Sequence, residues 1–83
     1  MIIGAGAAGQ MVTKELLLSN RINAKPVCII DDNSNKWNRY IDGVPVVGGR
    51  EYILTAIQEY DVDQIFFAIP TAKPEEKRDI LNI

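Results

Sequence analysis

The chain opens on a short apolar segment that runs directly into a glycine-rich turn, G-x-G-x-x-G, formed by Gly4, Gly6 and Gly9. In such a turn the first glycine permits a sharp exit from a strand, and the second lets a pyrophosphate approach the main chain. The third lets the following helix pack closely on the sheet, with its free N–H groups facing the phosphate. Because glycine-rich turns also arise for purely conformational reasons, a structural turn is the alternative interpretation.

An amphipathic helix is predicted after the glycines, because apolar residues recur there at helical spacing. The residues are Ala8, Val12 and Leu16 in one row, with Met11 and Leu18 beside it. A strand before the turn and a helix after it are the context that a dinucleotide-binding turn requires. This context favours a nucleotide site over a merely structural turn.

Four strands are predicted. The first is the short segment 2–3, and the second and fourth are the continuous apolar runs 26–30 and 65–69. Runs without polar alternation are typical of strands that helices cover on both faces. The third strand, 44–47, contains Pro45, which cannot donate a ladder hydrogen bond and therefore suits an edge position.

The segments between the strands complete the expected fold. Residues 33–43 are predicted to form a polar loop or a short irregular helix, and a last helix starts at Pro74. A helix over 50–60 has one apolar face, made of Ile53, Ala56, Ile57 and Tyr60. This order predicts an α/β fold, a doubly wound parallel sheet of about four strands in the order 3-2-1-4 with helices on both faces. Residues 1–83 would then be a partial Rossmann-like domain of a longer protein, since a complete one continues to further strands.

Composition excludes several kinds of site. The net charge is −2 without a block of like charge, so we expect no nucleic-acid partner. With no histidine and a single cysteine, the chain alone cannot assemble a Cys/His zinc site or a Ser-His-Asp triad. Cys28 lies in an apolar run and is expected to be a buried hydrophobe. No tyrosine is followed four residues later by a lysine, as in short-chain dehydrogenases, so we expect no catalytic residue.

In a sheet of this order, ligands lie at the switch point between the first and fourth strands, outside their carboxyl ends. Three segments meet there. The candidate cofactor-binding residues are Gly4, Ala5, Gly6, Ala7, Ala8 and Gly9, then Asp31 and Asp32, then Ala68, Ile69, Pro70 and Thr71.

Asp31 lies 22 residues after Gly9, near the spacing of about 20 expected for the residue that reads a ribose. A carboxylate there accepts hydrogen bonds from ribose hydroxyls and repels a 2′-phosphate, so it favours NAD over NADP. A solvated Asp-Asp-Asn turn is the alternative. Asp32 takes the role if the register differs by one residue.

The loop that follows carries two cations and the only tryptophan. Lys36 and Arg39 could reach a phosphate or a base edge, although a solvated loop face is the more usual role of such residues. Trp37 could cover a base, but packing of the loop onto the sheet is the favoured interpretation. Thr71 either binds the ligand or helps to start the last helix, and Lys73 occupies the expected cap position of that helix.

Five blocks in this order resemble one known domain: residues 2–9, 30–33 with Lys36-Trp37, 43–49, 62–65, and 68–70 ahead of Pro74. The domain is the first Rossmann-like, CoA-binding-like domain of bacterial polysaccharide-biosynthesis nucleotide-sugar enzymes. These enzymes are membrane-associated relatives of UDP-N-acetylglucosamine 4,6-dehydratases and nucleoside-diphosphate-sugar epimerases. The resemblance extends over essentially the whole chain.

The resemblance implies that transmembrane helices come first in the parent protein, then this domain, then an NAD(P)-dependent domain that oxidises the sugar at C4. This chain would be the accessory nucleotide-binding module. The expected ligand is NAD or NADP, with CoA or a UDP-sugar as further alternatives. Its expected partners are the catalytic domain of the parent protein and, as an option, a second copy of the chain. The expected location is the cytoplasm, with the parent anchored at the inner membrane.

Two alternatives stay open from the sequence. The glycine-rich start, the Asp31-Asp32 pair and residues 43–48 also resemble the nucleotide-sugar-binding N-terminal domain of bacterial sugar acyltransferases. A non-enzymatic sensor that binds NAD or CoA is the other alternative. Such a sensor should carry a DNA-binding or dimerisation segment, and the chain has no basic patch in its sequence.

Overall fold

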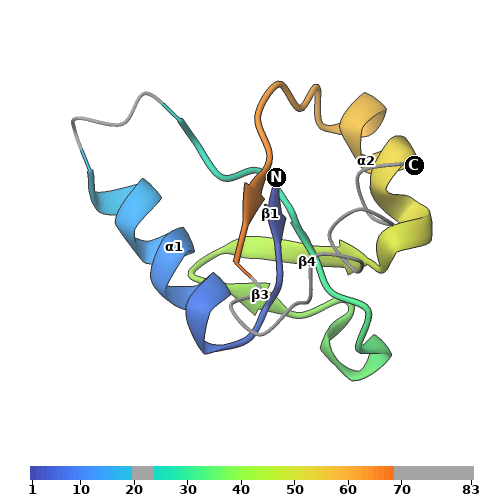
Figure 1. Cartoon of the computed structure of the whole chain (residues 1–83), viewed down its shortest axis with the longest axis horizontal. Coiled ribbons are helices and arrows are strands. Elements are labelled where there is room, and N and C mark those ends of the chain that lie inside the picture. Colours follow the sequence, from blue (N-terminus) through green and yellow to red (C-terminus); the bar gives the residue numbers. More distant parts are fainter. Residues whose placement is uncertain (20–23, 69–83) are drawn as a thin grey trace.

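A computed structural model describes residues 1–19 and 24–68 of the chain (Figure 1). The helices and strands are β1 (Ile2–Ile3), α1 (Ala7–Leu18), β2 (Ile29–Ile30), the 3-10 helix η1 (Ser34–Lys36), β3 (Tyr40–Ile41), β4 (Val44–Gly48), the 3-10 helix η2 (Arg50–Tyr52), α2 (Ile53–Glu59) and β5 (Phe66–Phe67). The predicted last helix and Lys73 lie outside the described residues, as do Ile69, Pro70 and Thr71. No helix of the described part is long and apolar enough to cross a membrane.

The strands form one sheet in the order β3-β4-β2-β1-β5. β1 pairs in parallel with β2 on one side and β5 on the other, and β2 pairs in parallel with β4. Ile2 is opposite Ile29 in one pair and opposite Phe66 in the other. The four predicted strands therefore lie in the predicted order 3-2-1-4, and the α/β fold class is confirmed.

The fifth strand, β3, corrects the expectation for the loop 33–43. Only η1 is helical there, and Tyr40–Ile41 pairs antiparallel with β4. The turn between them has Asp42 at φ 50° and Gly43 at φ 86°. Two central residues with positive φ make the tight turn that best matches the twist of a hairpin, and Asp-Gly is a preferred pair for it. This dipeptide is the sequence signal that predicts β3.

The hairpin also changes the position of the proline. β4 was expected at the edge of the sheet, but β3 covers it, so that expectation is wrong. Pro45 lies opposite Tyr40 in the hairpin. The Val46 amide donates to the Arg39 carbonyl at 2.8 Å, so the hairpin is held by residues beside the proline.

Helices cover both faces of the sheet, and each face has its own apolar core (Figure 1). The core on the α2 side consists of Met1, Ile3, Cys28, Ile30, Ile53 and Ala56. The core on the α1 side consists of Ile2, Ala5, Leu16, Ile29, Val44, Val46 and Ala68. The predicted face of α2 and the burial of Cys28 are confirmed, and burial raises the pKa of the Cys28 thiol.

The predicted row of α1, Ala8, Val12 and Leu16, packs on the core of the α1 side, but the residues expected beside it do not. Its buried residues are Gly9, Thr13 and Leu16, whereas Met11 is 67% exposed and Leu18 is 75% exposed. Thr13 is fully buried, and its hydroxyl is satisfied because it donates to the Gly9 carbonyl at 2.7 Å. The helix therefore approaches the sheet most closely at Gly9, while Leu16 reaches into the core one turn beyond Thr13.

Candidate nucleotide-binding site

Two of the three glycines in the turn are required by the fold. Gly4 has φ 115°, a conformation that strongly favours glycine. A β-carbon at Gly9 would lie 1.9 Å from the Gly4 carbonyl oxygen, because α1 turns back against the end of β1 there. These two residues bring the start of α1 over the carboxyl edge of the sheet, as the motif predicts.

Gly6 is different, because nothing in the described structure requires a glycine there. It is the N-cap of α1 with φ −78° and ψ −164°, an extended conformation open to any residue. A β-carbon on Gly6 would meet only the Lys36 ammonium, at 3.8 Å. No acidic residue lies in the first turn of α1, and its N-cap, Gly6, has no side chain to cap it. The space at Gly6 therefore lies at the positive end of a helix whose first N–H groups have no side-chain acceptor among residues 1–19 and 24–68.

Asp31 lies against the glycine turn, as predicted for a residue at the end of the neighbouring strand. Its Oδ2 accepts a hydrogen bond from the Ala5 amide at 2.7 Å, and its Oδ1 accepts one from the Asn33 amide at 2.8 Å. The Lys36 ammonium lies 3.9 Å from Oδ2, and the Asp31 side chain is 17% exposed. An ionised carboxylate has about four acceptor positions, so these contacts fix the turn and leave capacity for a ribose hydroxyl.

Asp32 belongs to a different contact. Its carboxylate accepts hydrogen bonds from the amide and the Nε of Arg50 at 2.9 and 2.8 Å, and Arg50 Nη2 is 2.6 Å away. Hydrogen bonding from the Arg50 side chain is the main reason that the pKa of Asp32 lies below its ordinary value. Asp32 thus ties the end of β2 to η2, on the side away from the turn.

Asparagine in place of Asp32 is expected to lower the free energy of unfolding at pH 7 by under about 1 kcal/mol, because the pair is exposed and solvent-screened. The pKa of the Asp32 carboxyl is lower in the folded protein than in the unfolded chain, where it is about 3.9. The pair with Arg50 therefore stabilises the fold above that pH, and this stabilisation disappears as the pH falls through the pKa of the folded state. Urea unfolding at pH 7 and pH 3 checks this. An equal difference between wild type and variant at both pH values would contradict it.

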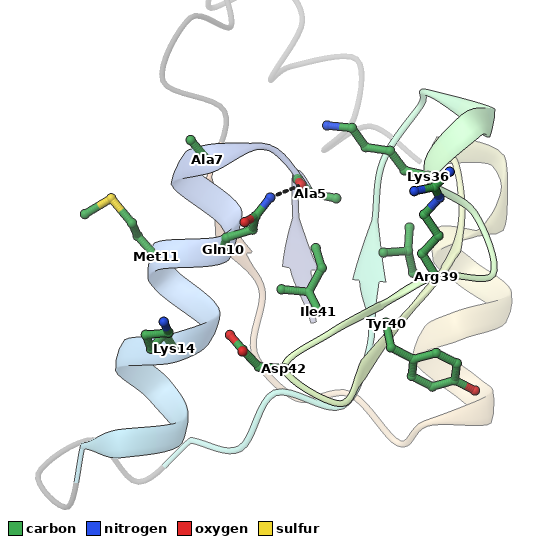
Figure 2. A pocket seen from close by; sticks show the side chains of 11 residues that line it. Ala5, Ala7, Gln10, Met11, Lys14, Lys36, Arg39, Tyr40, Ile41 and Asp42 are labelled. Carbon is green, nitrogen blue, oxygen red and sulfur yellow. Dashed lines mark hydrogen bonds between the residues drawn. The ribbon is translucent and has the colours of Figure 1, made fainter.

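A cleft of about 660 Å³ extends from the glycine turn between α1 and the β3–β4 hairpin (Figure 2). Its lining residues are Ala5, Ala7, Gln10, Met11, Lys14, Lys36, Arg39, Tyr40, Ile41, Asp42 and Val46. Gln10 donates to the Ala5 carbonyl at 3.4 Å and connects the helix to the turn. The sequence pattern predicted neither Gln10 nor Lys14 as a site residue, although their spacing of four places both on one side of a helix.

The charge of the cleft is opposite to that of the chain. Lys14, Lys36 and Arg39 line it against one carboxylate, Asp42, although the net charge of the chain is −2. Within residues 1–19 and 24–68, the ion pairs join Lys36 to Asp31 and Arg50 to Asp32. Lys14 and Arg39 therefore carry positive charges that no described carboxylate pairs, and the cleft suits an anionic ligand.

Two further residues singled out in the sequence, Trp37 and Ala68, do not line the cleft. The Trp37 indole N–H donates to the Asp31 carbonyl at 2.6 Å, and its ring lies against Gly49, where a β-carbon would be 3.2 Å from Cζ2. Trp37 thus holds the loop against the ends of β2 and β4, as the favoured interpretation predicts, although 38% of the residue is exposed. Ala68 is buried, and its amide donates to the Ile3 carbonyl at 2.8 Å, beside β1 at the end of β5.

Comparisons with known proteins identify the family of the chain. The family model described as CoA-binding domain matches residues 1–83. The probable polysaccharide biosynthesis protein EpsC of Bacillus subtilis is 38% identical over 76 residues, which are 92% of this chain and 13% of that protein. The capsular polysaccharide biosynthesis protein CapD of Staphylococcus aureus is 31% identical over 84 residues, covering 100% of this chain and 14% of that protein. No solved structure matches the chain.

The resemblance found in the sequence, to a CoA-binding-like domain of polysaccharide-biosynthesis proteins, is thereby confirmed. The chain spans only 13% and 14% of the length of these two relatives. What the relatives do as whole proteins is therefore a separate question from what this domain does.

Proposed function

The chain belongs to the CoA-binding domain family, and from this premise we propose that it is the nucleotide-binding module of a polysaccharide-biosynthesis protein. Its ligand is an adenine nucleotide with a diphosphate, namely NAD, NADP or CoA. The diphosphate binds at the N-terminus of α1, and the rest of the nucleotide occupies the cleft between α1 and the hairpin. A UDP-sugar has the same diphosphate and is the competing ligand.

The observation that carries this proposal is that no backbone angle or contact in the described structure requires a glycine at position 6. Gly4 and Gly9 are explained by the fold, but Gly6 has an ordinary extended backbone, and among the described residues only the Lys36 ammonium comes within 4 Å of where its side chain would be. A ligand that must approach the backbone closely explains the absence of a side chain there. The helix end, which Gly6 cannot cap with a side chain, and the ammonium of Lys36 both favour a negative group in that space.

In the parent protein, we propose that this module serves an NAD(P)-dependent domain that oxidises a nucleoside-diphosphate hexose at C4, in a dehydratase or epimerase type of reaction. Catalysis belongs to that other domain. The present chain has no histidine, and none of its three tyrosines is followed four residues later by a lysine. Its own part is therefore to bind a nucleotide and to hold it beside α1.

Calorimetric titration of the chain with CoA, NAD, NADP and UDP-N-acetylglucosamine tests the proposal. We expect saturable binding of an adenine nucleotide. A thermal scan at about 100 times the dissociation constant should show a stabilisation of about 2.7 kcal/mol, several degrees for a small domain. Binding of the UDP-sugar alone would replace the adenine-nucleotide proposal, and binding of none would contradict it.

Alanine in place of Asp31 is expected to weaken nucleotide binding by about 1–3 kcal/mol, the cost of losing a hydrogen bond to a charged group. Part of the loss comes from the ribose and part from the Ala5 amide, which loses its acceptor. Titration calorimetry below the melting temperature of the variant measures the change. Asp32→Ala is the matched control, because its carboxylate faces Arg50. Unchanged affinity in Asp31→Ala, or the same loss in Asp32→Ala, would contradict the assignment.

A further inference from the structure

The hairpin side of the cleft carries two cations that a diphosphate alone does not account for. Lys36 follows β2 on η1, and Arg39 comes just before β3. Figure 2 shows both on the wall opposite α1, whereas Lys14 lies on α1 itself. The Val46 amide donates to the Arg39 carbonyl at 2.8 Å, so the hairpin fixes the backbone from which the guanidinium extends.

Within the described part of the chain, Lys36 has one long ion pair and Arg39 has none. The Lys36 ammonium is 3.9 Å from Asp31 Oδ2, too long for a hydrogen bond, and no described carboxylate pairs with Arg39. Arg50 provides the contrast, because it contacts Asp32 at 2.6 Å. Both cations line the cleft that also reaches the N-terminus of α1, so an anion bound there is attracted by the two side chains and by the helix end.

The position of these cations relative to Asp31 indicates which anion they bind. In this fold class, an acidic residue after the second strand reads the ribose hydroxyls of NAD, whereas a nearby arginine accommodates the ribose phosphate of NADP. This chain has both kinds of residue, Asp31 and Arg39. The Lys36 ammonium lies 3.9 Å from Asp31 Oδ2. Its positive charge offsets the repulsion that the Asp31 carboxylate alone would exert on a ribose phosphate. Arg39 adds a planar set of donors that matches phosphate geometry.

We propose that Lys36 and Arg39 recognise a phosphate group on the adenosine ribose. The cleft then selects a ribose-phosphorylated nucleotide, with a 3′-phosphate as in CoA or a 2′-phosphate as in NADP, over its unphosphorylated counterpart. This rests on the proposed function and specifies its ligand class. It also reverses the preference for NAD that Asp31 alone predicts.

Dissociation constants of two ligand pairs test the proposal: CoA with 3′-dephospho-CoA, and NADP with NAD. In the wild-type chain we expect the phosphorylated member of one pair to bind at least about tenfold more tightly, and that pair identifies the position of the phosphate. The double variant Lys36→Gln/Arg39→Gln should bring this ratio close to one. Lys25→Gln is the matched control, since Lys25 is exposed and is not among the residues lining the cleft. It should preserve the ratio.

The other outcomes are decisive as well. Equal affinity within both pairs would overturn this inference while the proposed nucleotide binding stands. A ratio that survives in the double variant would also overturn it, because other residues would then recognise the phosphate. If none of the four nucleotides binds the wild-type chain, the proposed function itself fails, and this inference fails with it.

Discussion

Alanine in place of Gly9 should destabilise the domain by about 3 kcal/mol or more, even though alanine is the better helix former. The new β-carbon would lie 1.9 Å from the Gly4 carbonyl oxygen, so α1 would have to move away from β1. That movement opens the core that Leu16 and Ala5 share with the sheet. The expected result is a melting temperature lower by more than about 10 °C in a circular-dichroism scan.

Gly6→Ala is the control for this experiment. It makes the same chemical change three residues away, where the nearest atom to the new β-carbon is the Lys36 ammonium at 3.8 Å. Alanine at an N-cap costs less than about 1 kcal/mol relative to glycine. If Gly9→Ala melts within about 3 °C of Gly6→Ala, the helix does not depend on this close approach, and our account of the turn is wrong.

Valine in place of Gly6 should nearly abolish nucleotide binding while the fold remains. The isopropyl group would fill the space at the N-terminus of α1 and separate the ligand from the helix N–H groups. Loss of two hydrogen bonds to a charged phosphate, at about 1.5 kcal/mol or more each, corresponds to a roughly 100-fold weaker affinity. Titration calorimetry measures it, and circular dichroism verifies that the variant is folded.

Gly6→Ala again provides the comparison, because its single methyl group should weaken binding less than valine does. A folded Gly6→Val variant with wild-type affinity would show that the glycine turn is only structural. The predicted effects of Gly6→Val and Gly9→Ala are therefore opposite in kind. One removes the ligand and keeps the fold, and the other destabilises the fold.

The sequence predicts the parallel part of the fold well, because each of its signals is local. The glycine spacing predicted the turn from β1 into α1, and the apolar runs predicted four strands in the observed order. The hairpin strand β3 escaped prediction because two residues are too short to show alternation. Its one clear signal is the Asp42-Gly43 turn.

The candidate site was harder to predict, since it depends on which way neighbouring side chains point. Successive residues at the end of a strand face opposite sides of the sheet. Asp31 therefore contacts the glycine turn and Asp32 contacts η2, although the two are adjacent and chemically identical. The far wall of the cleft requires the position of the hairpin, so Arg39 and Tyr40 could not be placed opposite α1 from the sequence.

Amide-resolved NMR of the ¹⁵N-labelled chain, titrated with CoA and with NAD, tests the central claim most directly. We predict that the shift changes concentrate at Gly6 and Ala7 on one side of the cleft and at Lys36 and Arg39 on the other. Amides of the α2 face, such as those of Ile53 and Ala56, should stay unchanged because they lie across the sheet. Saturating nucleotide that leaves the glycine turn unperturbed, or that perturbs α2 instead, would contradict a nucleotide site at the start of α1.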